Sequence, residues 1–520
     1  MAIAEGKMMR FSKGVRCIFA LLIVTSVVGC KATDEVTVTG FDAKDHTSGA
    51  INGVEKHHAW VVQGVQNQTV QVGVSILNKH NKTSAPLNTD SVILVGDRQT
   101  RHFLMNPCLD KKGNPTNCQQ SEISLNYNAP SLPALDVETK TRVADRYTVQ
   151  ADYGADTMTS APAVVEVLRP YCQVNAAPFS TLGMTFETPI GAAPAAGWPT
   201  LLFVHGGGLN RRNHVDMEAY AASMLEQGYA VANMNYRLVD TEGGNNSTIY
   251  AKAASWKDPV SDVKCAIRYL KENSAVLKLN ANKIGLVGHS SGANIAMEAA
   301  LTVNSSMPEF AEQGTPIHLG SAAQGYDTSV AALFTMDAIV NYSVFWKLFD
   351  ESVDAFVKAQ PLSTITEIYS KKSVSDFINE QTIINGFSHK SDNWENHPSA
   401  IAQNMVTQVN LQTDLPVYME HSTVVRKFAG LPLKTAPYNS WKSGCTFVNA
   451  VQATGSAKQR GQTFAKDVVN GSHEDFVANA GVVGRVTVDM LGFFDYYLKN
   501  QGAKPSTGFD YSRCASLNAG

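Results

Sequence analysis

A serine between glycines is the residue of this chain whose surroundings most clearly suggest chemistry. Ser290 lies in the pentapeptide Gly288–Gly292, which reads G-H-S-S-G and fits the pattern G-x-S-x-G. The apolar run before it, Lys283–Val287, is typical of a strand, and the alanine-rich run after it, 293–302, is typical of a helix. A serine on such a strand-to-helix turn can act as a nucleophile, and side chains in place of the glycines would collide with neighbouring backbone. We therefore predict that Ser290 is a nucleophile; an unreactive glycine- and serine-rich turn is the alternative.

A run of three glycines follows another apolar segment. The segment Trp198–Val204 is typical of a buried strand and ends in His205–Gly208, which reads H-G-G-G. Because glycine has no side chain, backbone N–H groups in such a loop can approach and stabilise a negatively charged oxygen. A flexible turn is the alternative. We expect His205 to be a structural residue of the loop.

Strands and helices alternate from about residue 171 onward. The segments between the two glycine-containing motifs include a strand pattern at 230–238 and a helical pattern at 258–272. Such alternation is typical of βαβ units in a parallel sheet. Before it, residues 31–170 contain short alternating segments such as Val70–Ile76, with turn residues between them. The sequence therefore predicts an α/β domain over 171–520, preceded by a β-rich, sandwich-like module over 31–170.

Together these motifs resemble those of α/β-hydrolases of the carboxylesterase and lipase kind that carry an H-G-G-G loop. Two more segments fit: Asn235–Leu238 is similar to their Y-R-L strand end, and Asp258–Ala266 is similar to their P-x-x-D-x-x-x-A helix. The resemblance covers residues 172–500. It implies a mostly parallel central sheet, and a catalytic serine, acid and histidine in that chain order, with no cofactor.

The resemblance also implies the other catalytic positions. The oxyanion is expected to be held by the backbone amides of Gly207, Gly208 and Ser291. The base is expected near the C-terminus, where His473 follows the strand-like run 464–469 in a loop. An imidazole can accept the serine proton near neutral pH. An exposed loop histidine without a role is the alternative.

The acid is not at the place that the resemblance implies. In related enzymes it follows a strand similar to Leu415–Ser422, but the corresponding position here is Val425. Some relatives, including the plasma platelet-activating-factor acetylhydrolases, carry the acid one strand earlier, and Ala331–Ala338 resembles that strand. We therefore predict that Asp337 is the acid that orients the imidazole. Glu420 or another residue is the alternative.

A segment after the predicted acid differs from the strand-and-helix pattern around it. Residues 343–397 contain many aromatic residues and several helical patterns. Related enzymes often carry an insertion at this place that covers the active site. The resemblance therefore implies a cap-like insertion here.

The first thirty residues, 1–30, are typical of an export signal. Basic residues precede the apolar run Cys17–Val28, which is short for a membrane-spanning helix. Gly29 before Cys30 resembles the lipobox of bacterial lipoproteins, in which the cysteine carries the lipid; an ordinary secretory signal is the alternative. Lys31 does not resemble the aspartate that retains lipoproteins at the inner membrane. We therefore expect an exported protein, lipid-anchored at the outer membrane or cell surface or facing the periplasm, whose contact with the membrane is the anchor alone.

An exported chain can form disulfides. Cys108 and Cys118 flank a turn-rich segment and are expected to pair. Cys445 with Cys514 is a possible second pair. Cys265 lies within a helical pattern, and we expect it to be a buried thiol.

Composition and missing motifs exclude other classes of protein. The chain has 43 basic and 46 acidic residues and a net charge of −3, with no basic run that would indicate nucleic-acid binding. The sequence has no H-E-x-x-H motif and no paired C-x-x-C motif, so we expect no metal.

The combined expectation is a serine hydrolase that cleaves small-molecule or lipid carboxylic esters through Ser290, Asp337 and His473. A peptidase or a phospholipase acylhydrolase on the same fold is one alternative, because fold does not determine substrate. A catalytically inactive hydrolase fold used for binding is another, suggested by Val425 at the usual acid position.

Overall fold

The computed structural model describes the following residues: 60–66, 69–77, 92–97, 100–103, 120–132, 135–136, 141–153, 156–159, 163–175, 181–210, 212–239, 252–253, 255–303, 305, 307–320, 325–340, 404–405, 414–423, 427–428, 431–432, 441–468 and 471–506. The expected export signal with Cys30, the Cys108–Cys118 pair and the cap-like insertion at 343–397 lie outside these residues.

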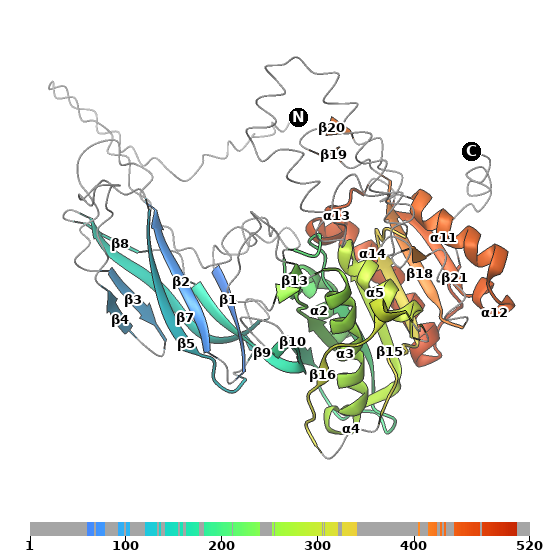
Figure 1. Ribbon diagram of the computed structural model, residues 1–520, viewed down its shortest axis with the longest axis horizontal. Helices are drawn as coiled ribbons and strands as arrows, with labels where there is room; N and C mark the ends of the chain where they lie inside the picture. Colours follow the sequence, from blue (N-terminus) through green and yellow to red (C-terminus); the bar gives the residue numbers. More distant parts are fainter. Residues whose placement is uncertain are drawn as a thin grey trace, which may run out of the picture.

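In the part of the chain that the structure describes, six strands form the parallel part of the central sheet (Figure 1). Each pairs in parallel with its neighbour, in the sheet order β21 (Thr463–Val468), β18 (Val417–Ser422), β17 (Ala332–Met336), β15 (Leu279–His289), β11 (Trp198–Val204) and β12 (Ala230–Met234). Beyond β12 the sheet continues with two antiparallel strands, β10 (Thr181–Glu187) and β9 (Ala163–Gln173). The prediction of an α/β domain with a mostly parallel sheet is confirmed.

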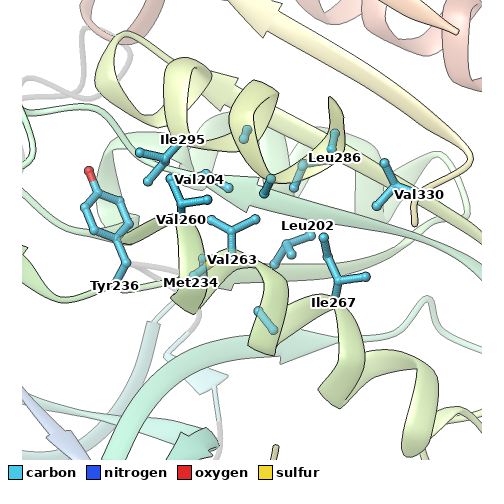
Figure 2. Packing of buried hydrophobic residues seen from close by; sticks show 14 of the residues in the cluster. Leu202, Val204, Met234, Tyr236, Val260, Val263, Ile267, Leu286, Ile295 and Val330 are labelled. Atoms are coloured by element: carbon cyan, nitrogen blue, oxygen red, sulfur yellow. The ribbon is translucent and has the colours of Figure 1, made fainter. Parts of the chain in front are cut away.

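Helices cover both faces of this sheet. The main ones are α2 (Glu218–Glu226), α3 (Lys257–Glu272), α5 (Ser291–Leu301), α11 (Trp441–Thr454) and α14 (Ala480–Phe494). Successive side chains of a strand point to opposite faces. Leu202 of β11 therefore belongs to the core beneath α3 and α5, whereas Phe203 belongs to the core beneath α2 and α14. Figure 2 shows Val263 of α3 and Ile295 of α5 in the first of these cores. Because both faces are covered, the middle stretches of the central strands, such as Leu201–Val204 and Ala332–Phe334, are continuously apolar in sequence.

Shorter elements connect the main ones. They are α4 (Ser274–Leu277), α12 (Ala457–Arg460), α13 (Asp475–Ala478), the 3-10 helices η1 (His214–Met217) and η2 (Pro308–Phe310), the π-helical turn η5 (Asp495–Lys499), and the short strands β13 (Leu238–Val239), β14 (Lys252–Ala253), β16 (Thr315–Pro316), β19 (Lys427–Phe428) and β20 (Leu431–Pro432). In the described part of the chain, no helix is long and apolar enough to cross a membrane.

All elements described before β9 are strands: β1 (Trp60–Val65), β2 (Thr69–Leu77), β3 (Val92–Gly96), β4 (Thr100–Phe103), β5 (Gln120–Asn128), β6 (Leu135–Asp136), β7 (Thr141–Tyr153) and β8 (Asp156–Thr159). Most of them belong to the sheet around β7, while β2 and β5 form a separate antiparallel pair. The N-terminal region is thus β-rich, as the short alternating segments predict.

Strand β9 belongs to both regions. Its first half pairs with β1 and β7 at Ala163–Leu168, and its second half pairs with β10 at Arg169–Gln173. The expected boundary at residue 170 therefore falls inside one continuous strand, which Figure 1 shows as the link between the two regions.

A disulfide joins β9 to helix α3, which packs on the central sheet. Cys172 of β9 is bonded to Cys265 of α3, and both residues are fully buried. The expectation of a free buried thiol at Cys265 is therefore wrong. The helical pattern around Cys265 correctly places it in a core, but its partner lies on another element, 93 residues away. Cys445 is also disulfide-bonded, whereas Cys514 lies outside the described residues.

Candidate active site

The turn between β15 and α5 holds Ser290 in a strained conformation. Its φ is 55° and its ψ is −126°. Positive φ is costly for a residue with a side chain and persists only where the surrounding structure enforces it. The neighbouring glycines allow this close packing: a Cβ on Gly288 would lie 2.4 Å from the carbonyl oxygen of Gly292, and a Cβ on Gly292 would lie 2.1 Å from that of His205.

The three residues predicted as serine, histidine and acid of the site form one hydrogen-bonded chain. His473 Nε2 lies 2.8 Å from Ser290 Oγ, and His473 Nδ1 lies 2.8 Å from Asp337 Oδ2. Ser290 follows β15, Asp337 follows β17, and His473 lies between β21 and α13. Since these strands are parallel, their carboxyl ends lie at the same edge of the sheet and bring together residues distant in sequence. With Nδ1–H donating to the carboxylate, Nε2 can accept the serine proton.

The Asp337 carboxylate is fully buried and ionised. Burial alone would raise the pKa of Asp337, but the hydrogen bond and charge of His473, with His421 and the Ser422 amide, together lower it. Ser422 donates from its backbone N to Oδ1 at 2.8 Å and from its hydroxyl to Oδ2 at 2.7 Å. Sequence reasoning missed Ser422, although it ends the strand in which the acid was first sought.

Glu420 has a different environment from Asp337. Its backbone oxygen accepts a hydrogen bond from the Asp337 amide at 2.8 Å, but its side chain interacts with Asp489. Burial, and then Asp489, raise the pKa of Glu420 well above its usual value, so its carboxyl group is protonated. The structure brings Asp337, and not Glu420, to His473.

A second histidine supports the loop of His473. The Nε2 of His289, which precedes Ser290, lies 3.1 Å from the His473 carbonyl oxygen, and the two rings are 5.0 Å apart. Burial lowers the pKa of His289 to about 3, so it is neutral and donates through Nε2–H. Sequence reasoning treated His289 only as a variable position of the motif.

The glycine loop lies against the turn that carries Ser290. A Cβ on Gly206 would be 3.1 Å from the Cβ of Ser290, and Gly207 and Gly208 have φ of 109° and 64°. Among the described residues, none accepts a hydrogen bond from the amides of Gly207, Gly208 or Ser291. These amides, which the sequence predicts as oxyanion donors, thus have no hydrogen-bond acceptor within the described part of the chain.

His205 has a structural environment. Its ring stacks on that of Tyr236 at 4.1 Å between centroids, and the Tyr236 hydroxyl donates to the His205 carbonyl oxygen at 3.0 Å. Burial lowers the pKa of His205 to about 3. Tyr236 therefore fixes the direction in which the loop carbonyls point, which in turn orients its amides.

An arginine connects the two loops that meet at Ser290. Arg212 binds Asp216 Oδ2 through Nη1 at 3.0 Å and Glu474 Oε2 through Nη2 at 2.9 Å. Glu474 directly follows His473, so this arginine links the segment after the glycine loop to the histidine loop. Sequence reasoning missed Arg212.

The Y-R-L and P-x-x-D segments also meet, but away from the serine. Arg237 Nη2 lies 2.7 Å from Asp262 Oδ1, and the Arg237 amide donates to Oδ2 at 2.8 Å. This buried pair attaches the segment after β12 to α3. Among the described residues, no cluster of three or more His, Cys, Asp and Glu side chains could hold a metal ion.

Comparisons with known proteins find similar sequences for part of this chain. A family model described as BD-FAE matches residues 192–382. An AB hydrolase superfamily protein of Schizosaccharomyces pombe is 34% identical over 127 residues, which are 24% of this chain and 33% of the relative. The chain thus aligns with about one third of the length of that relative.

Solved esterase structures from Thermogutta terrifontis are also similar. A butyrate-bound esterase has 14% sequence identity and a TM-score of 0.41, covering 64% of this chain and 96% of its own. Esterase 2 phosphonylated by sarin has 13% identity and the same TM-score of 0.41, with the same coverage of 64% and 96%.

The mostly parallel sheet with helices on both faces and the strained serine turn form an α/β-hydrolase fold. The segment that matches the BD-FAE family model, 192–382, contains the glycine loop, the serine turn and Asp337.

Proposed function

We propose that this protein is a serine hydrolase that cleaves carboxylic esters through Ser290, His473 and Asp337. The observation that carries the proposal is the unbroken hydrogen-bonded chain from Ser290 Oγ through both nitrogens of the His473 imidazole to Asp337 Oδ2, at 2.8 Å for each step.

In the first half of the reaction, Ser290 Oγ attacks the ester carbonyl carbon while His473 Nε2 takes the hydroxyl proton. Asp337 stabilises the imidazolium that forms. The amides of Gly207, Gly208 and Ser291 stabilise the negative oxygen of the tetrahedral intermediate, at about 3–4 kcal/mol for each donor.

The intermediate collapses when the carbon–oxygen bond to the leaving alcohol breaks and His473 returns the proton to that alcohol. Water then attacks the acyl-enzyme by the same route, with His473 as base, and the carboxylic acid leaves as Ser290 regains its proton. Every proton moves through one imidazole, so the reaction needs no cofactor.

The test is hydrolysis of p-nitrophenyl acetate, butyrate and octanoate by the purified full chain. We expect turnover, with kcat at least about a thousandfold lower in Ser290→Ala than in the parent protein. The relative rates on the three esters would define the acyl-chain preference.

A folded parent protein without turnover on any of these esters would contradict the proposal. An aminopeptidase substrate panel and phospholipid substrates would then separate an acyl hydrolase of another kind from a hydrolase fold that serves in binding.

We further propose that the protein is exported and lipid-anchored at Cys30 in a bacterium. The basic and apolar pattern before Cys30 supports this, as does the buried Cys172–Cys265 disulfide, because disulfides persist in oxidising compartments. Metabolic labelling with an alkyne fatty acid is expected to label the parent protein and not Cys30→Ser; equal labelling of both would contradict the anchor.

A further inference from the structure

The acid of the site comes from a strand whose neighbour extends further. Strands β17 and β18 pair in parallel with Met336 opposite Glu420, and the Asp337 amide donates to the Glu420 carbonyl oxygen at 2.8 Å. β17 ends at Met336, but β18 continues through His421 to Ser422. The end of β18 therefore reaches past the backbone of Asp337 to its carboxylate.

Ser422 contacts both oxygens of that carboxylate. Its amide donates to Oδ1 at 2.8 Å, and its hydroxyl donates to Oδ2 at 2.7 Å. Oδ2 also accepts the Nδ1–H of His473 at 2.8 Å. Ser422 and Asp337 have exposed fractions of 2% and 0%, so no solvent competes strongly for these bonds.

Two donors from one residue fix the plane of the carboxylate. The terminal torsion of an aspartate is broad and twofold, so an unheld carboxylate would present its lone pairs to His473 in variable directions. With Oδ1 and Oδ2 each bound by Ser422, rotation breaks both bonds together. The remaining lone pair of Oδ2 then points at Nδ1 of the imidazole.

The titratable groups around Asp337 do not hold its carboxylate in place of Ser422. Among the described residues, His473, His421 and His289 act on the carboxylate. His421 Nδ1 lies 3.9 Å from Oδ1, which is too long for a hydrogen bond. Burial lowers the pKa of His421 to about 4 and that of His289 to about 3, so both are neutral neighbours.

We propose that Ser422 is a positioning residue of the hydrolase, which acts by holding the Asp337 carboxylate in the plane that orients His473. In enzymes that this chain resembles, the strand corresponding to β18 carries the acid itself. Here the same strand supplies the donors that hold an acid from β17. The inference rests on the proposed serine hydrolase function.

The test compares Ser422→Ala with the parent protein on p-nitrophenyl butyrate. We expect kcat to fall about ten- to a hundredfold, the range for losing a hydrogen bond to a charged group, while KM stays within about twofold. General damage to the fold would also disturb substrate binding and raise KM. Ser422→Thr keeps the hydroxyl and is expected to recover most of kcat.

Thr423→Ala is the matched control. It removes a hydroxyl from the next residue, which donates to the Val468 carbonyl oxygen at 3.0 Å rather than to Asp337. We expect its kcat to stay within about twofold of the parent protein. Should Ser422→Ala not fold, Ser422→Cys keeps the volume but offers a weak donor, and the same loss of kcat is expected.

A second readout does not require turnover. The Nδ1 proton of His473 gives a far-downfield proton resonance while it is held against the carboxylate. We expect this signal in the parent protein, Ser290→Ala and Thr423→Ala, and its broadening or loss in Ser422→Ala.

The two readouts separate the two proposals. If the parent protein is inactive but its signal is lost in Ser422→Ala, the proposed hydrolase function is contradicted. The proposed role of Ser422 in holding the carboxylate is then still supported. Unchanged kcat in Ser422→Ala, or in Ser422→Cys where that variant is used, together with an unchanged signal, would overturn the role of Ser422.

Discussion

Three histidines lie close together at the candidate site, and burial keeps two of them neutral. His289 and His421 are buried, and burial lowers their pKa values to about 3 and about 4. His473 lies between a hydroxyl and a carboxylate. Because the two neighbours are neutral, they would not repel the positive charge that His473 gains in the proposed reaction.

The two carboxyl groups considered as the acid lead to opposite expectations. Asp337→Asn leaves a neutral side chain beside His473 and is expected to lower kcat/KM about 10³- to 10⁴-fold on p-nitrophenyl butyrate. Glu420→Gln replaces a carboxyl group that is already protonated and is expected to change kcat/KM less than about threefold.

Both variants keep the volume of the original side chain, so each serves as the control of the other. A large loss of kcat/KM in Glu420→Gln, with activity kept in Asp337→Asn, would show that the acid has been assigned to the wrong strand.

The positions of Ser290, Asp337 and His473 could be predicted because motif, chain order and strand ends are visible in the sequence. Their supporting residues could not be predicted in this way. Arg212 and Glu474 are 262 residues apart, and Ser422 and Asp337 are 85 apart. A serine or arginine that acts through one tertiary contact has no local pattern that distinguishes it from an ordinary surface residue.

At the scale of elements, a buried ion pair connects β9 to η1. Glu166 Oε1 lies 2.9 Å from His214 Nε2, and both side chains are fully buried. The other ring nitrogen faces Asn235 Oδ1 at 3.2 Å, and that oxygen also accepts the His214 amide. Since both ring nitrogens face acceptors, the imidazole donates from both and is positively charged.

This pair predicts a stability that depends on pH. Burial alone would lower the pKa of His214, but the charge and hydrogen bond of Glu166, with Glu218 and Asn235, raise it above 6.5. A raised pKa contributes stability that is fully present below about pH 6.5 and is lost as the pH rises through the folded-state value. Glu166→Gln should therefore lower the free energy of unfolding by about 3–5 kcal/mol at pH 5.5 and by less at pH 9.

Thermal unfolding of the parent protein and Glu166→Gln at both pH values measures this difference. Glu309→Gln is the control, because Glu309 pairs with a partly exposed Lys257 at 3.9 Å. This variant should lose little stability at either pH. A difference for Glu166→Gln that grows toward pH 9 would contradict the charged pair.

Periodicity placed most elements close to their observed bounds. The helical pattern at 258–272 corresponds to α3 at Lys257–Glu272, and the strand 198–204 is β11 itself. The last helix, α14, starts at Ala480, where the Asn479 side chain accepts hydrogen bonds from the amides of Gly481 and Val482. Gly481 and Gly484 are weak helix formers, so the start of this helix is hard to predict from sequence.

At the scale of the whole molecule, β9 prevents a simple division into two parts. Its first half belongs to the N-terminal sheet and its second half to the central sheet, with a disulfide and a buried ion pair beside it. Near residue 170 the sequence changes from short alternating segments to a pattern of strands and helices. In the structure this change marks the point where one strand changes its pairing partners. A composition shift cannot reveal that a strand continues across it.

The Cys172–Cys265 bond also bears on the order of events during synthesis. Cys265 is the next cysteine after Cys172 along the chain. If the chain enters an oxidising compartment with its N-terminus first, as proposed above, Cys172 meets its native partner before either of the two later cysteines arrives. The pairing that fastens β9 to α3 can then form before a wrong bond to either of those later cysteines is possible.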